Sequence, residues 1–181
     1  MKANYDSNIT VVAPDSGAVA DAEELAGRTD AKEIAFIPKI RNPQTGKTRN
    51  YGIIGDDPSG TSVVLWGDIV DSGSTLEGAC NEIEKAGASG IAIYTTHALF
   101  NPPAQDFIPQ LNARIVVTDT VYHPEEFYQR MGVDKVMPMS HVFGEAIKRQ
   151  CMRGSTCIVK LAVGGFYLLT DNRTNLVLTI K

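Results

Sequence analysis

Short apolar runs alternate with segments whose apolar residues recur at helical spacing over most of the chain. The runs are apolar at successive positions, as expected of strands that are buried on both faces of a parallel sheet. They occupy residues 9–13, 34–37, 62–66, 91–94, 115–117 and 136–137, and residues 51–54 are a further candidate.

Between these runs the spacing predicts amphipathic helices. In one of them, residues 76–86, the apolar side chains fall on a single face, and Gly87 follows where glycine commonly ends a helix. Further helices are predicted at 18–26, at 104–111, at 124–131 with Pro124 in the first turn, and from Ser140, as the cap, to about residue 151. The repeated alternation of strand and helix predicts an α/β fold with a doubly wound parallel sheet.

Two segments depart from this rhythm. Residues 39–50 are polar and basic and contain Pro43 and Gly46, which predicts an exposed loop or mobile hairpin. After residue 156 two candidate strands, 166–170 and 176–180, are separated by a polar stretch typical of a hairpin. Exposed strand edges invite pairing with another chain, so an oligomer is predicted.

Composition narrows the function. The 181 residues, 43% of them hydrophobic, suit one globular domain. The net charge of −4 disfavours a nucleic-acid partner, because a basic excess is needed to neutralise a strand of phosphates. The three cysteines fit neither a disulfide framework nor a zinc site and are expected to be reduced core thiols. Without an apolar leader or a long apolar run, a soluble, cytoplasmic protein with no membrane partner is expected.

The segment from Gly67 to Thr75 carries the clearest chemistry. It follows an apolar strand and precedes a predicted helix, which is where ligands bind in open α/β sheets. Backbone N–H groups and hydroxyls can converge there on an anion at the helix N-terminus, and a glycine allows close approach. The residues that supply these groups are Ser72, Gly73, Ser74 and Thr75.

Two carboxylates precede this phosphate cradle, Asp68 and Asp71. Carboxylates would repel the phosphate itself, so we expect them to accept hydrogen bonds from the hydroxyls of an attached sugar. The segment therefore predicts a site for a ribose 5-phosphate group.

The segment resembles the signature of type I phosphoribosyltransferases, a family that includes ribose-phosphate diphosphokinase (phosphoribosyl-diphosphate synthetase). Four further segments resemble the diphosphokinase, in order, over about residues 9 to 150. They are Val11 to Gly17, Lys39-Ile40-Arg41, Tyr94 to Ala104, and residues 116–120 with the helix from Ser140 to Arg149.

The resemblance implies roles for individual residues. Asp15 would help to ligate Mg²⁺, which prefers hard oxygen ligands. Lys39 and Arg41, on a flexible catalytic loop, would stabilise the transferred diphosphoryl group as catalytic residues. The implied domain covers residues 1–155, and residues 156–181 form a C-terminal hairpin extension of it.

Two departures from the family qualify the function. Gly67 stands where the family usually has a first acid. The family's N-terminal domain, which carries most of the ATP site, has no counterpart in these 181 residues. The expected function is therefore a ribose 5-phosphate half-site for diphosphoryl transfer from ATP, which forms phosphoribosyl diphosphate only with an ATP-binding partner or domain.

Two alternatives stay open. One is a free-standing phosphoribosyltransferase that consumes phosphoribosyl diphosphate, with the extended tail recognising a base. The other is a non-catalytic regulatory subunit that assembles with a complete synthetase in a homo- or hetero-oligomer.

Overall fold

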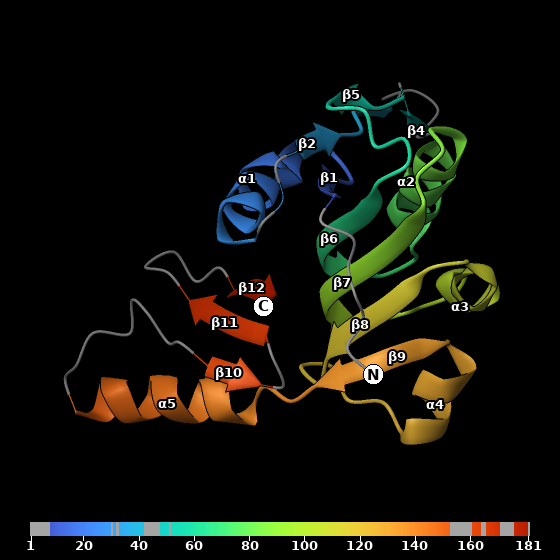
Figure 1. Cartoon of the computed structure of the whole chain (residues 1–181). Helices are drawn as coiled ribbons and strands as arrows, with labels where there is room; N and C mark the ends of the chain where they lie inside the picture. The colour runs from blue at the N-terminus through green and yellow to red at the C-terminus, as the bar shows by residue number, and fades with distance from the viewer. Residues whose placement is uncertain are drawn as a thin grey trace.

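A central sheet of seven strands organises the molecule, with the order β5-β2-β1-β6-β7-β8-β9 (Figure 1). The computed structural model describes residues 8–29, 31, 33–41, 48–50, 52–152, 161–163, 166–170 and 176–180. All neighbouring strands of this sheet run parallel except β5, which is antiparallel to β2. The strands are β1 (Ile9–Ala13), β2 (Glu33–Phe36), β5 (Ile54–Gly55), β6 (Ser62–Val70), β7 (Gly90–Ala98), β8 (Arg114–Thr118) and β9 (Val133–Met137).

Helices cover both faces of this sheet, so the predicted doubly wound α/β fold is confirmed. On one face lie α2 (Ser74–Lys85), α3 (Ala104–Phe107) with the 3-10 turn η2 (Ile108–Gln110), and α4 (Glu125–Arg130). On the other face lie α1 (Val19–Arg28), which follows the 3-10 turn η1 (Ser16–Ala18), and α5 (Ser140–Cys151).

The two apolar cores follow from the alternation of side chains along each strand. In β6, Leu65 belongs to the core under α2 and Trp66 to the core under α1. Both are buried, which explains why this strand is apolar at successive positions.

The sheet reverses its strand order between β1 and β6. From β1 the chain first adds β2 on one side and later adds β6 on the other. A reversal of this kind opens a crevice at the carboxyl ends of the two strands, where open α/β sheets bind their ligands. The segments that follow β1 and β6 therefore define the place to look for a site.

Strand β6 is longer than the sequence predicts. It was expected to end at Trp66 but continues to Val70, paired in register with β7 as far as Ala98. Gly67 and Asp68 break the apolar pattern of the strand, yet the backbone pairing of β6 with β7 does not depend on side chains. The loop before α2 is correspondingly short.

The two irregular segments form small antiparallel sheets. Strands β3 (Lys39–Arg41) and β4 (Thr48–Asn50) make the predicted hairpin. The candidate strand at residues 51–54 coincides with β5 only at Ile54, and residues 52–53 are not strand. In the tail, β11 (Phe166–Thr170) pairs with β12 (Leu176–Ile180) as predicted, and β10 (Leu161–Val163) adds a third strand. Residues 42–47, 51 and 171–175, which were expected to complete these hairpins, lie outside the described residues.

Two helix predictions need correction. The helix expected over residues 104–111 is a four-residue helix followed by a 3-10 turn, because Pro109 has no N–H to continue the helical ladder. Ser140 does not cap the last helix: it is the first helical residue, and Met139 is the cap. The Met139 N–H instead donates to the Asp119 carboxylate at 2.7 Å.

The cysteines are free thiols where the structure describes them, but only one is a core residue. Cys80 is buried in α2, and burial together with the nearby Glu84 raises its pKa to about 12. Cys151, expected in the core, is exposed at the end of α5. Cys157 lies outside the described residues. No helix in the described ranges is long and apolar enough to cross a membrane.

Candidate functional site

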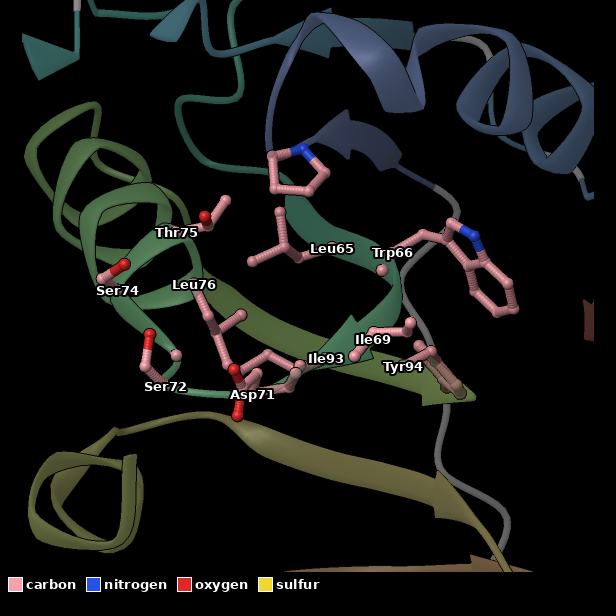
Figure 2. Close-up of a pocket in the computed structure, with 14 residues that line it drawn as sticks. Leu65, Trp66, Ile69, Asp71, Ser72, Ser74, Thr75, Leu76, Ile93 and Tyr94 are labelled. Carbon is pink, nitrogen blue, oxygen red and sulfur yellow. The ribbon is translucent and has the colours of Figure 1, made fainter. Parts of the chain in front are cut away.

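A pocket of about 160 Å³ lies where β6 ends and α2 begins. Its floor is apolar and its rim carries the hydroxyls of the first turn of α2 and the loop before it (Figure 2). The lining residues are Pro14, Leu65, Trp66, Gly67, Ile69, Val70, Asp71, Ser72, Gly73, Ser74, Thr75, Leu76, Ile93 and Tyr94.

Gly73 gives the loop its shape. It has φ of 73° and ψ of 3°, a left-handed conformation that glycine adopts without steric strain. A Cβ at this position would lie 2.5 Å from Cζ of Phe107. Any other residue at position 73 would therefore have a strained backbone, and its side chain would collide with the ring of Phe107.

Helix α2 presents an anion-binding end to the pocket. It starts at Ser74, directly after Gly73, and the first N–H groups of a helix have no partner within the helix. These amides and the helix dipole favour an anion, and the hydroxyls of Ser72, Ser74 and Thr75 can donate to its oxygens. The structure thus brings together all four predicted cradle residues.

Lys39 reaches the cradle from a distant part of the sequence. It lies in β3, and its Nζ donates a hydrogen bond to Oγ1 of Thr75 at 2.5 Å. The contact joins residues 36 positions apart and adds a cation to the anion-binding end of α2. Arg41 lies in the same strand, but its side chain is outside the described part of the structure.

The two predicted sugar-binding acids have different positions. Asp71 lines the pocket, is exposed, and accepts a hydrogen bond from Nδ2 of Asn101 at 2.8 Å. Asp68 is also exposed, but it is absent from the lining, and its carboxylate accepts from the N–H of Ile69 at 2.7 Å. The geometry therefore favours Asp71 as the nearer acid.

Asp15 lies beside the pocket at the end of β1, next to the lining residue Pro14. Its Oδ1 accepts from the N–H of Gly17 at 2.9 Å and so caps the following 3-10 turn. Within the described ranges no three His, Cys, Asp or Glu side chains come together in a way that could hold a metal ion. Asp15 is thus one of several carboxylates at this edge of the sheet that do not gather into a metal-binding cluster.

Sequence reasoning missed Asn101, which follows β7 at the same edge of the sheet. Its place just beyond a strand end was a usable signal, since neighbouring parallel strands end at one edge. His97, within the segment Tyr94 to Ala104 that resembles the diphosphokinase, makes a hydrogen bond between its Nδ1 and Oγ1 of Thr120 at 2.9 Å and does not line the pocket.

The fold and the position of the pocket are those of a doubly wound α/β protein with its ligand site at the switch point of the sheet. A model of the phosphoribosyl transferase domain matches residues 2–129, so the chain belongs to that family. The fold is therefore that of the type I phosphoribosyltransferases, as the sequence resemblance predicted.

Individual relatives define the resemblance further. The chain is 36% identical to the ribose-phosphate pyrophosphokinase of Hyphomonas neptunium over 142 residues, covering 78% of this chain and 45% of the relative. It is 32% identical to the ribose-phosphate pyrophosphokinase of Corynebacterium glutamicum over 141 residues, which cover 77% of this chain and 43% of that relative. The crystal structure of phosphoribosylpyrophosphate synthetase from Mycobacterium smegmatis superposes with a TM-score of 0.67 at 28% identity, covering 81% of this chain and 46% of that chain.

These relatives confirm the predicted similarity to the diphosphokinase branch of the family, ribose-phosphate pyrophosphokinase being another name for ribose-phosphate diphosphokinase. The chain spans somewhat less than half the length of the relatives it matches.

Proposed function

We propose that the chain supplies the ribose 5-phosphate half-site of a ribose-phosphate diphosphokinase. In this reaction O1 of ribose 5-phosphate attacks the β-phosphorus of ATP, the bond from that phosphorus to the α-phosphate oxygen breaks, and AMP leaves. The observation that carries the proposal is the pocket at the N-terminus of α2, whose hydroxyls and amides suit a phosphate and whose Asp71 suits a sugar.

The 5-phosphate would occupy the cradle from Ser72 to Thr75. Its charge is favoured by the amides of the first turn of α2 and by the dipole of that helix. The sugar hydroxyls would then lie toward Asp71, whose carboxylate can accept their hydrogen bonds, with Asp68 further out. A ligand bound in this way has its anionic and hydroxylated ends matched to donors and acceptors, respectively.

Lys39 and Arg41 would act on the transferred group. Both belong to β3, whose partner β4 completes the hairpin, so a movement of the hairpin would carry both cations together. Diphosphoryl transfer depends mainly on positioning and on neutralising the charge that develops, which cations supply. In the structure Lys39 contacts Thr75, and on ligand binding its ammonium group would exchange that contact for one with the transferred group.

The acidic residues fit Mg²⁺ only if the ion also binds phosphate oxygens of the substrate. Asp15 stands beside the pocket, Asp71 in the lining is assigned to the sugar, and the described residues offer no cluster of three or more metal ligands. Mg²⁺ commonly retains waters and uses one or two carboxylates together with phosphate oxygens of the substrate. Asp15 would therefore hold an ion that arrives with the nucleotide, where it would offset phosphate charge.

The first test is binding. Titration calorimetry of the purified chain with ribose 5-phosphate should give a heat of binding, and ribose without the phosphate should not. The Asp71→Asn variant should keep its thermal unfolding midpoint and bind the sugar phosphate more weakly, because Asp71 is exposed and contributes little to the fold. Absence of ribose 5-phosphate binding by the wild-type chain would overturn the proposal.

The second test is turnover. The chain is mixed with ATP, Mg²⁺, ribose 5-phosphate and the part of a ribose-phosphate pyrophosphokinase that it does not resemble, and AMP is followed. AMP formation that requires both polypeptides supports the half-site. Binding without AMP, with any ATP-binding partner, contradicts the catalytic role and favours a regulatory subunit. Release of diphosphate from phosphoribosyl diphosphate on addition of a nucleobase would favour the transferase alternative.

A further inference from the structure

The Asp71 carboxylate is held by a second segment of the chain. Asn101 donates from Nδ2 to Oδ1 of Asp71 at 2.8 Å, across 30 positions of sequence. An ionised carboxylate has several lone pairs, so this bond leaves the second oxygen able to accept from another donor. The side-chain amide of Asn101 therefore fixes one carboxylate oxygen of Asp71 and leaves the other oxygen available to a ligand.

Asn101 is itself held in place by the residue before it. Phe100 is 1% exposed and has φ of 48°, a left-handed conformation uncommon for a residue with a side chain. Its N–H donates to the carbonyl oxygen of Val70 at 3.0 Å, and its own carbonyl accepts from Nε2 of Gln105 at 2.8 Å. A buried ring and two hydrogen bonds thus fix the backbone from which Asn101 projects.

The same segment also contacts the other end of the Asp71 loop. The carbonyl of Asn101 accepts from the N–H of Ala104 at 2.9 Å as α3 begins. Ala104 and Phe107 pack over Gly73, so closely that a Cβ on that glycine would lie 3.2 Å from Cβ of Ala104. The segment from Phe100 to Phe107 therefore touches the loop before Asp71, at Asp71 and after it.

We propose that Asn101 is a positioning residue that orients Asp71 toward the hydroxyls of a pentose phosphate, and that it thereby sets the preference of the pocket for a sugar phosphate over free phosphate. This inference rests on the proposed function. The phosphate cradle lies one to four residues beyond Asp71 and does not involve Asn101, so the two parts of the ligand are recognised separately.

The test compares two ligands, ribose 5-phosphate and inorganic phosphate, by titration calorimetry on the full chain. Asn101→Ala should lower the affinity for ribose 5-phosphate about three- to tenfold, the effect of one net hydrogen bond, and should leave the affinity for inorganic phosphate unchanged. Asn101→Asp, which keeps the shape but places a second anion beside Asp71, should weaken it further. Asn112→Ala, an exposed asparagine outside the pocket, is the matched control and should change neither affinity.

A double-mutant cycle separates positioning from direct contact. If Asn101 acts through Asp71, then Asn101→Ala does not lower the affinity for ribose 5-phosphate any further in a chain that already carries Asp71→Ala. Additive losses would show that Asn101 acts independently of Asp71, and an equal loss for both ligands would show a general collapse of the loop. Either result overturns the inference while the proposed function stands. A wild-type chain that binds no ribose 5-phosphate overturns both.

Discussion

At residue 73 the backbone leaves no choice of side chain. The left-handed conformation and the approach of Phe107 act together, and both are needed to turn the chain from β6 into α2. By contrast, a Cβ on Gly90, at the start of β7, would meet nothing within 4 Å. The two glycines therefore form a matched pair for testing the importance of the turn.

Gly73→Ala is expected to destabilise the chain by about 2 to 4 kcal/mol, the sum of backbone strain and overpacking against Phe107. The free energy of unfolding from urea titration measures this effect, with Gly90→Ala as the control expected to stay close to wild type. Phosphate affinity should fall in the first variant alone. Equal stability of the two variants would contradict the turn geometry described for position 73.

Lys39→Ala is expected to lower turnover about 100-fold in the assembled reaction, while the KM for ribose 5-phosphate changes much less, because its main interaction forms with the transferred group. AMP formation by the chain with its ATP-binding partner gives both parameters. Lys85→Ala is the control, since Lys85 is exposed and pairs with Glu82 on the outer side of α2. Parallel losses in turnover and affinity would assign Lys39 to binding of the 5-phosphate at Thr75.

At the scale of elements, the sequence was informative wherever a pattern is local. The apolar runs located the strands of the main sheet, and the Ser-Gly-Ser-Thr run located the turn into α2. The extension of β6 beyond Trp66 was missed because it depends on pairing with β7, which lies outside that segment. The role of Asn101 and the hydrogen bond from the Met139 N–H to Asp119 were missed for the same reason, since both act across 20 or more positions.

The tail contributes its own small sheet and no strand to the seven-stranded sheet in the described structure. Its strand β12 lies alongside α1, on the face opposite α2 (Figure 1). This arrangement supports the proposed division into a domain of residues 1–155 and an extension of residues 156–181.

A chain shortened to residues 1–155 is therefore expected to fold and to bind ribose 5-phosphate as the full chain does. Circular dichroism during thermal unfolding and titration calorimetry check the two parts of this prediction. Loss of cooperative unfolding would show that the tail belongs to the core. Loss of binding with the fold intact would show that the tail takes part in recognition, as the transferase alternative requires.

At the scale of the whole molecule, the chain matches a little under half of each ribose-phosphate pyrophosphokinase compared above. The proposed ribose 5-phosphate half-site would need a second polypeptide or domain to bring ATP to the sugar. The described structure also leaves strand edges at β5 and β9 of the main sheet and at β10 and β12 of the small sheet. Such edges offer unpaired backbone groups to another chain.

An oligomer is therefore expected in solution. Light scattering coupled to size-exclusion chromatography should give a mass that is a multiple of 19.6 kDa at working concentration. The shortened chain of residues 1–155 distinguishes the edges involved: a fall to monomer assigns the contact to the tail, and an unchanged number of chains in the oligomer assigns it to the main sheet. A strictly monomeric full chain would refute the expectation.

The length of β6 has a consequence for which ligands can fit. Because Asp68 to Val70 are extended strand held in register by β7, the spacing between the outer acid and the first cradle residue, Ser72, is set by rigid backbone. At about 3.3 Å per residue, four residues span at most about 13 Å. This backbone therefore keeps Asp68 at a fixed place outside the pocket lining, and a sugar held against Asp71 is not brought closer to Asp68 by a movement of the strand.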